Sequence, residues 1–200
     1  MSDSPATTAV LDIAQLRQAE DTAAWVLEEA KRQGADGVEV NVSLSQGYSV
    51  NVRQGEVETV EFHRDRGVSV TVFRGQRKGH ASSSDDNRDS LRDTIQAAAS
   101  IARYTEEDRY AGLAPASMLA REVPDLDLYH PWAMDTQAAI DEALRCETVA
   151  RNDARIVNSE GASINSGASL RVFATSEGFL HGYRGTHHSR VCSVVAEDEN

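Results

Sequence analysis

The densest set of potential metal ligands lies late in the chain. His187 and His188 are adjacent, His181 lies upstream of them, and Glu197 lies downstream. Imidazole nitrogens and carboxylate oxygens are ordinary zinc ligands, so this set could in principle hold a metal ion. Adjacent residues of a strand point to opposite faces of a sheet, however, so His187 and His188 are poorly placed to bind the same ion. We therefore interpret the pair as two polar residues where a strand begins.

A second candidate chemistry is nucleophilic hydrolysis. Ser166, His187 and Asp153 have the residue types of a hydrolytic triad, in which the histidine takes the serine proton and the carboxylate orients the histidine. Any serine-rich chain supplies such a trio, and nothing in the sequence positions Ser166 as a nucleophile. We expect no catalytic residue in this set.

Three closely spaced carboxylates form the third candidate. Glu56, Glu58 and Glu61 fall in a strand pattern with Val57 and Val60. Paired carboxylates can act as acid and base when a site holds them close together. The interpretation that we favour is a solvated strand face, or a sheet edge protected by charge.

Motifs of other enzyme classes are missing from the sequence. None of the six histidines is followed by glutamate, so the helical zinc motif with two His ligands and a Glu base is absent. The sequence also lacks a GxSxG elbow, a GxxxxGK[ST] loop and a GxGxxG turn after a strand. Gly75–Gly79 resembles a phosphate loop superficially but lacks its second half. The sequence therefore predicts no catalytic, cofactor-binding or metal-binding residue in this chain.

The elements around these side chains predict an α+β fold, with largely antiparallel sheets packed with a few helices. Apolar residues three and four apart predict a helix over Ile13–Gln33, ended by Gly34. Alternating apolar residues then predict four short strands, with turns at Ser45–Gly47 and Arg64–Gly67 among them. Their expected ranges are Val38–Leu44, Tyr48–Val52, Val57–Phe62 and Val68–Phe73. Because the loops are short, these strands are expected to be antiparallel.

The remaining chain is predicted to contain two more helices and a second set of strands. Gly75–Asp86 is expected to be a polar connection, Asp89 or Ser90 to cap the second helix, and Asp135 to cap the third. The expected domain ranges are a disordered leader at 1–8, a helix, β-meander and helix at 9–103, an irregular connection at 104–134, and a helix with the start of a second β-rich unit at 135–200.

A short internal echo suggests that one unit is used twice. Gly67–Phe73 aligns with Gly167–Phe173, which lies 100 residues later, and Gly, Ser, Val and Phe recur at matching places. Because strands followed by turns select such residues anyway, the echo by itself is weak evidence of duplication.

Composition excludes several classes of partner. The net charge is -12, from 32 acidic and 20 basic residues, so the surface repels phosphate backbones and we expect no direct nucleic-acid partner. No apolar run approaches the length of a membrane span and the N-terminus has no signal-peptide layout, so we expect a soluble, cytoplasmic protein without a membrane partner. The two cysteines, Cys146 and Cys192, show no spacing typical of zinc or of a disulfide framework, so we expect both to be reduced.

Several segments together resemble one protein family, the PmbA/TldE family, which belongs with TldD among metalloproteases and was formerly labelled modulator of DNA gyrase. The segments are GEVETVEF at Gly55–Phe62, RKGHASSSD at Arg77–Asp85, IARYT at Ile101–Thr105, PDLDLYHP at Pro124–Pro131, and RIVNSEGASINS through VFATSEGFLHGYRGTHHS at Arg155–Ser189. They occur through nearly the whole chain in the order expected for the family.

The resemblance implies a subunit of a bacterial cytosolic metalloprotease that matures or degrades unfolded peptides. It implies that the zinc and its His/Glu motif belong to the TldD-like partner, and that this chain binds no cofactor. Family members are about twice this long, so these residues resemble the N-terminal portion. No catalytic residue of the family maps onto a position in this sequence.

The resemblance leads to one main hypothesis and two alternatives. The main hypothesis is a noncatalytic subunit that pairs with a TldD-like zinc subunit and helps to enclose unfolded peptide substrates. The Gly/Ser-rich range 158–169 could then supply a sheet edge for a peptide or partner, or could be a flexible surface hairpin. The alternatives are a stand-alone protein- or peptide-binding domain without a proteolytic role, and an independent hydrolase that uses His187 or His188.

Overall fold

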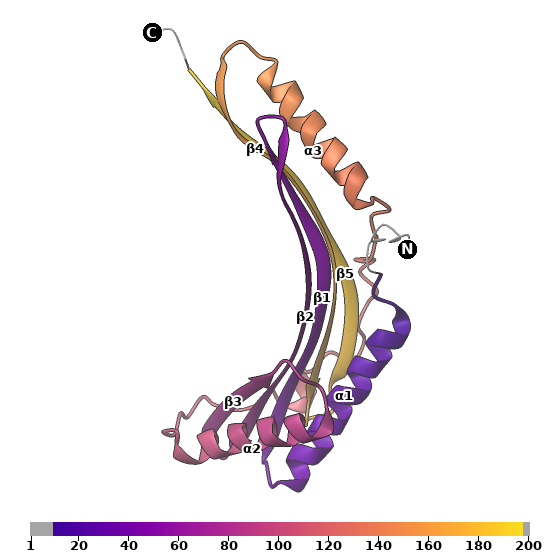
Figure 1. Ribbon diagram of the computed structural model, residues 1–200. Helices are drawn as coiled ribbons and strands as arrows, with labels where there is room; N and C mark the ends of the chain where they lie inside the picture. The colour runs from indigo at the N-terminus through magenta and orange to yellow at the C-terminus, as the bar shows by residue number, and fades with distance from the viewer. Residues whose placement is uncertain (1–9, 198–200) are drawn as a thin grey trace.

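A computed structural model describes residues 10–197 of the chain, so the expected disordered leader at 1–8 lies outside the described residues. Within this range the chain forms three α-helices, one short 3-10 helix and five strands (Figure 1). The helices are α1 Ile13–Arg32, α2 Arg88–Tyr104, η1 Ala116–Met118 and α3 Thr136–Arg151. The strands are β1 Gly37–Arg53, β2 Glu56–Arg74, β3 Arg77–Ser83, β4 Ile156–Thr175 and β5 Leu180–Ala196.

The five strands form one antiparallel sheet in the order β3-β2-β1-β4-β5. This arrangement confirms the predicted α+β class. The expected ranges 9–103 and 135–200 both contribute to this sheet, because β1 pairs with β4 along most of its length. The sheet is long and curved, and α1 and α3 lie on its convex side (Figure 1).

The prediction of many short strands was wrong. Ser45–Gly47 does not turn the chain, because β1 continues through it, and β2 likewise continues through Arg64–Gly67. Gly47 does not turn the chain but allows the backbone of β4 and the ring of His63 to approach β1 closely. The predicted polar connection at Gly75–Asp86 also contains β3, which pairs with the lower part of β2.

The helix ends follow local capping chemistry. Asp12 and Gln15 form a capping box at the start of α1, and Gly34 follows that helix with a φ of 81°. Asp135 caps α3 as predicted, because its side chain accepts a hydrogen bond from the Ala138 amide. The predicted cap of α2 was wrong by two or three residues, because Asn87 accepts from the amides that open this helix.

Two hydrophobic clusters divide the convex side of the sheet. In the lower cluster, α1 and α2 pack against valines of β1 and β2 and against the second half of β4. In the upper cluster, α3 packs small residues, Ala139 and Ala143, against Val50, Val52 and Ile164. Within residues 10–197, no helix is long and apolar enough to cross a membrane.

A helix followed by a long hairpin occurs twice in the fold, as α1-β1-β2 and as α3-β4-β5. The two hairpins meet where β1 and β4 pair, and the residues that correspond are Ser43–Val52 and Ser163–Val172, which are 120 residues apart. The structure therefore supports a duplication, but not the expected alignment. Gly67–Phe73 lies in the second strand of its hairpin, whereas Gly167–Phe173 lies in the first strand of the other.

Candidate functional site

The candidate site is the middle of the sheet, between the part covered by α1 and the part covered by α3. We call this region the waist and define it by residues 43–49 of β1 with their β4 partners, 165–171. Leu44 belongs to the lower cluster and Tyr48 to the upper one, so the helical cover changes between them.

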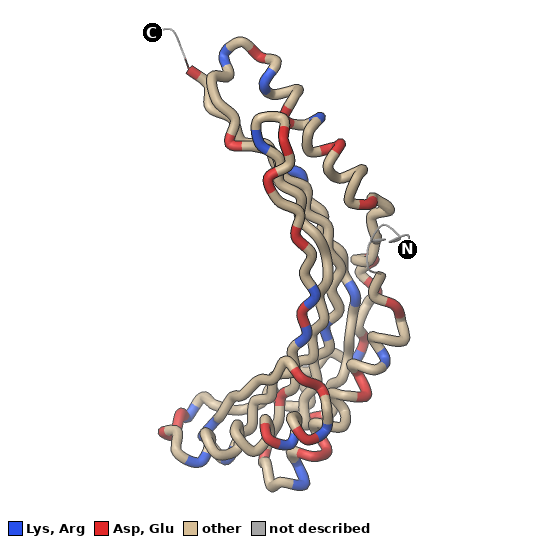
Figure 2. Tube along the Cα trace, in the orientation of Figure 1, with Lys and Arg blue, Asp and Glu red and all other residues tan. Residues whose placement is uncertain are grey.

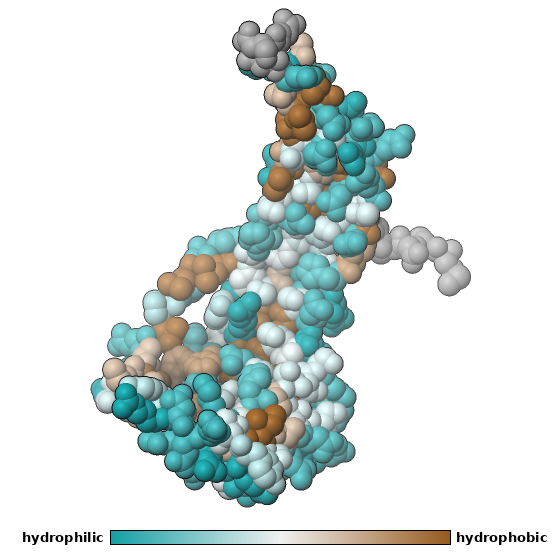
Figure 3. All heavy atoms as spheres, turned by 90° about the vertical axis from the view of Figure 1, so that its left-hand side faces the viewer, coloured by the Kyte–Doolittle hydropathy of each residue, from teal (hydrophilic) through white to brown (hydrophobic). Residues whose placement is uncertain are grey.

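Small polar side chains line the concave face of the waist. Residues of β1 and β4 alternate between the two faces, and every second residue is buried on the convex side. Across the waist and one residue pair beyond it, at 43–51 of β1 and 163–171 of β4, the residues on the concave face are Ser43, Ser45, Gly47, Ser49, Asn51, Ser163, Asn165, Gly167, Ser169 and Arg171. We call this set the open face. The middle of this side is pale in Figure 3, as expected for serine, threonine and glycine.

The open face carries few charges. Between Glu39 and Arg53, β1 has no charged residue, and between Glu160 and Arg171, β4 has none (Figure 2). At the lower end of the sheet the connection after α2 crosses the concave side, where Leu113 packs close to Gly37 and Phe73.

One row of four residues crosses the open face at its centre. His63, Gly47, Gly167 and His187 are consecutive cross-strand partners on β2, β1, β4 and β5. The order of residue types, His-Gly-Gly-His, is symmetric. A two-fold rotation about an axis through the Gly47–Gly167 pair exchanges the two hairpins, so each residue has a counterpart in the other hairpin. A hollow of about 370 Å³ lies over this row. Its lining includes Ser45, Ser49, Asn165 and Ser169 as well as the two histidines.

Gly47 is required by the close approach of its neighbours. A Cβ at this position would lie 2.4 Å from the carbonyl oxygen of Ser166 and 2.7 Å from Cε1 of His63. The ring of His63 therefore covers Gly47, which shapes one side of the hollow. A Cβ at Gly167 would meet its nearest neighbour, the carbonyl oxygen of Gln46, at 3.4 Å.

On the convex side, a buried polar chain ties the irregular connection to the waist. The Tyr48 hydroxyl donates to the carbonyl oxygen of Met134, with 3.0 Å between the oxygens. Ser166 Oγ lies 3.0 Å from Nδ1 of His188, and Nε2 of His188 lies 2.9 Å from the carbonyl oxygen of His130. Burial raises the pKa of Tyr48, and the charge of Asp135 adds to the rise. The tyrosine is therefore a neutral donor.

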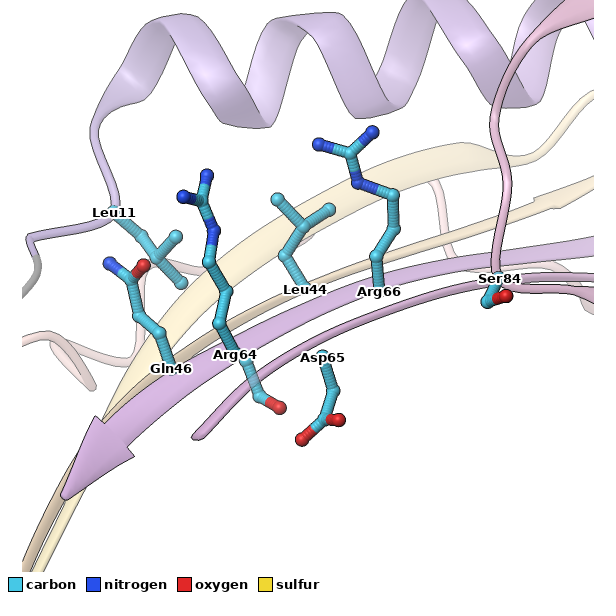
Figure 4. A pocket seen from close by; sticks show the side chains of 8 residues that line it. Leu11, Leu44, Gln46, Arg64, Asp65, Arg66 and Ser84 are labelled. Carbon is cyan, nitrogen blue, oxygen red and sulfur yellow. The ribbon is translucent and has the colours of Figure 1, made fainter. Parts of the chain in front are cut away.

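A smaller hollow of about 250 Å³ opens on the convex side next to α1. Figure 4 shows Leu44, Arg64 and Arg66 pointing toward the helix side, whereas Asp65 points to the opposite side. Arg66 is paired with Asp86, with 2.6 Å between Nη1 and Oδ2.

The structure separates the histidines that the sequence places together. His187 borders the open face, whereas His188 lies on the convex side with its ring 5.2 Å from that of Trp132. His187 lies six positions after His181 in β5, which is about 20 Å at the rise of a strand, and Glu197 is farther away in the other direction. These four residues do not form a metal site.

The candidate triad is also separated. Ser166 contacts His188 rather than His187, and it is only 1% exposed. Asp153 lies in the turn after α3, where Arg155 holds it with 2.7 Å between Nη2 and Oδ2. Hydrogen bonds from Arg155 hold the pKa of Asp153 far below its usual range. Asp153 therefore does not lie behind the Ser166–His188 pair.

Glu56, Glu58 and Glu61 are exposed on the part of β2 that β3 does not cover. Glu56 lies opposite Arg53 and Glu61 lies opposite Ser49. Their position at an uncovered edge agrees with the interpretation of charge as protection against pairing with other chains.

A buried carboxylate that sequence reasoning missed holds the upper turn. Glu147 of α3 is fully buried, and its two oxygens accept from the amides of Gln54 and Gly55 at 2.7 and 2.8 Å and from the Ser159 hydroxyl. Burial alone would raise the pKa of Glu147, but these hydrogen bonds and the charge of Arg151 lower it overall. Gln54 and Gly55 both have positive φ, as a two-residue hairpin turn requires.

The spacing of the donor groups decides whether they could hold a metal ion. Among residues 10–197, no three His, Cys, Asp or Glu side chains are close enough together to hold a metal ion. The described residues therefore do not fit a zinc centre.

Comparison with known proteins identifies two family regions in the chain. The family model described as PmbA/TldA metallopeptidase domain 1 matches residues 38–102. The model described as PmbA/TldA metallopeptidase central domain matches residues 129–200.

Curated relatives match most of the chain but extend well beyond it. The chain is 45% identical over 186 residues to Metalloprotease PmbA of Escherichia coli O157:H7, an alignment that covers 92% of this chain and 41% of that protein. It is 38% identical over 195 residues to the Metalloprotease PmbA homolog of Haemophilus influenzae, covering 97% of this chain and 43% of that protein. The chain thus spans less than half the length of these relatives.

Solved structures share the fold. A proposed modulator of DNA gyrase from Bacteroides thetaiotaomicron superposes with a TM-score of 0.81 at 19% identity, covering 96% of this chain and 43% of that chain. TldE from Thermococcus kodakarensis gives a TM-score of 0.72 at 15% identity, covering 89% of this chain and 40% of that chain. At these identities the likeness is one of fold.

Proposed function

Because the chain belongs to the PmbA/TldD metallopeptidase family, we propose that it is the N-terminal portion of a noncatalytic, TldE-like subunit. In this proposal it pairs with a TldD-like subunit that holds the zinc ion. Its curved sheet forms part of the wall around the space where unfolded peptides are cut.

The open face is the observation that carries this proposal. It combines concave shape with a surface of serine, asparagine and glycine at the waist. Such side chains donate and accept hydrogen bonds without selecting for charge, and their small size lets another backbone approach. A wall of this kind suits unfolded peptides of varied sequence.

The sheet also offers edges to which a peptide or partner strand could add, but not where the sequence suggested. The range 158–169 lies inside β4, which is paired with β1 on one side and β5 on the other. Both interpretations of it, as an edge and as a flexible hairpin, were wrong. The edges available are residues 56–67 of β2, which β3 does not cover, and the outer side of β5 away from Thr186, whose amide already donates to the carbonyl oxygen of Leu128. Extended chains add to such edges through backbone hydrogen bonds.

The same surface could serve a stand-alone peptide-binding domain that has no proteolytic role. Co-expression separates the two functions. The complete protein encoded by the reading frame of this chain should co-purify with a TldD-like protein, and the pair should cut an unfolded peptide. Failure to co-purify, with retained binding of unfolded peptide, would favour the stand-alone domain.

Substitutions on the open face test its role within the pair. Ser169→Arg places a long cation beside the hollow and should reduce peptide cleavage several-fold without preventing co-purification. The matched control is Ser100→Arg on the exposed surface of α2, which should cleave at the wild-type rate. Equal rates for the two variants would exclude the open face from substrate handling.

A further inference from the structure

The helix α3 runs in the same direction as β5 (Figure 1), and side chains of the two elements contact each other. At one such contact, Oε1 of Glu142 pairs with Nη2 of Arg190 at 2.6 Å. One turn farther along the helix, about 6 Å, is Cys146. Two residues farther along the strand, about 7 Å, is Cys192, on the same face as Arg190. Because the two advances are nearly equal and run in the same direction, they place Cys146 of α3 beside Cys192 of β5.

Other contacts agree with this placement. Both cysteines pack against the upper hydrophobic cluster, which includes Ala143 of α3 and Ile164 of β4. Cys192 is the cross-strand partner of Ala162, a member of the same cluster. Cys146 also lies close enough to Cys192 to raise the pKa of the Cys192 thiol. Sequence reasoning missed this pair, because the partners lie on different elements that only the fold brings together.

We propose that Cys146 and Cys192 form an oxidisable dithiol, a modification site at which a peroxide converts the contact between α3 and β5 into a disulfide bond. Both side chains are free thiols and only partly buried, so a molecule as small as hydrogen peroxide can reach them.

The reaction balances with hydrogen peroxide as the oxidant. One thiolate attacks a peroxide oxygen, the O–O bond breaks, and a sulfenic acid forms with release of one water after protonation. The second thiol attacks the sulfenic sulfur, the S–O bond breaks, and a second water leaves as the S–S bond forms. Each sulfur loses one electron, and the two peroxide oxygens are reduced to water. A dithiol reductant reverses the change by exchange.

The surroundings of Cys192 affect how fast the dithiol is oxidised, and not which product forms. Burial, the neighbouring Cys146 and the charge of Glu147 raise the pKa of the Cys192 thiol. The thiolate is the reactive form, so the raised pKa slows oxidation and keeps the pair reduced until peroxide persists. Once formed, the disulfide would fix the helix of one hairpin unit to the edge strand of the sheet.

Peptide mapping tests the proposal directly on the complete protein. Trypsin cleaves after Arg145 and Arg151, which releases a fragment Cys146–Arg151, and after Arg190, which releases a fragment that begins at Val191. After peroxide treatment and alkylation of free thiols, mass spectrometry should find these two fragments joined, with two hydrogens fewer than their sum. Dithiothreitol should restore two alkylated fragments.

Single variants provide the controls. Cys146→Ser and Cys192→Ser should each abolish the joined fragment. Oxidation should raise the Tm of the wild type by about 5–10 °C, because the bond restricts the unfolded chain, and should leave the Tm of both variants unchanged. The proposal is overturned if both fragments are recovered alkylated after oxidation, if the thiols go to sulfinic acid instead, or if cross-links form between molecules in the wild type.

Discussion

The hydroxyl of Ser166 donates a hydrogen bond to Nδ1 of His188, with 3.0 Å between the two atoms. The donor can be assigned because Nε2 of the same ring lies 2.9 Å from a carbonyl oxygen, which can only accept. In the neutral ring Nε2 therefore carries the hydrogen and Nδ1 accepts. The pair resembles part of a hydrolytic triad, but its serine is buried and a backbone carbonyl stands where a carboxylate would orient the histidine. We interpret it as a latch between the sheet and the connection at His130.

If the Ser166–His188 pair is structural, its removal should lower the stability of the protein without abolishing peptide cleavage. Ser166→Ala removes the hydroxyl from a buried chain of hydrogen bonds and should lower the free energy of unfolding by about 1–2 kcal/mol. Urea denaturation of the complete protein measures the effect. Ser169→Ala, two residues away on the open face, is the matched control and should change stability by less than about 0.5 kcal/mol. Peptide cleavage with the TldD-like partner should persist in Ser166→Ala; its abolition in a folded variant would support a hydrolase based on His188.

The two central glycines should respond differently to the same substitution. Gly47→Ala forces a Cβ to 2.4 Å from a backbone oxygen of β4, so the strands must move apart. The free energy of unfolding should fall by about 2–3 kcal/mol. Gly167→Ala, its symmetry counterpart, meets its nearest neighbour at 3.4 Å and should cost less than about 1 kcal/mol. Equal losses measured by denaturation would show that the strands do not approach as described.

Glu147 should make stability depend on acid pH. Its lowered pKa means that the folded state binds the proton less readily than the unfolded state does. Its contribution is therefore complete above the pKa of an unfolded glutamate, about 4.3, and is lost as pH falls through the lower folded value. Glu147→Gln keeps the size but removes the charge that three donors share, so it should destabilise the protein by about 1–3 kcal/mol at pH 7.

Urea denaturation at several pH values provides the comparison for Glu147. The gap between wild type and Glu147→Gln should narrow as the pH falls below 4, because the wild-type carboxylate becomes protonated. Glu160→Gln, an exposed glutamate on the neighbouring strand, is the control and should show no such gap. A gap for Glu147→Gln that stays constant with pH would contradict an ionised, hydrogen-bonded carboxylate at this turn.

The exposed glutamates of β2 should protect an open sheet edge. Replacing Glu58 and Glu61 together with valine removes two charges beside Val57 and Val60 and should promote edge-to-edge association. Light scattering during incubation at 37 °C should show faster aggregation than in the wild type. The control, Glu106→Val with Glu107→Val in the connection, should aggregate no faster, since these residues lie outside the sheet.

Elements with strong local patterns could be predicted from the sequence. The helix stripe from Ile13 and the cap at Asp135 depend on residues close together in the chain, and the structure has both. The turn predicted at Ser45–Gly47 was wrong because glycine serves two purposes. A glycine can turn the chain or can let another backbone or side chain approach closely. At Gly47 the second applies, because Ser166 and His63 lie against it, and these residues are distant in the sequence.

The site was predictable only in part. Alternation along a strand correctly separated His187 from His188. The similarity of Ser43–Val52 to Ser163–Val172 was present in the sequence, but its meaning depends on the register that pairs Gly47 with Gly167. Glu147 gave no local signal, because its partners lie in a turn 92 and 93 residues earlier.

In the proposed function, this chain forms a wall around a metal centre that a TldD-like subunit holds. The most direct test is the cleavage of an unfolded peptide by the complete protein, purified alone and then mixed with a TldD-like subunit, with the zinc content of each measured. We expect no cleavage and no stoichiometric zinc for the complete protein alone, and cleavage when the two are mixed. Cleavage by the protein alone, with zinc bound in a one-to-one ratio and lost on substituting His187 or His188, would contradict it.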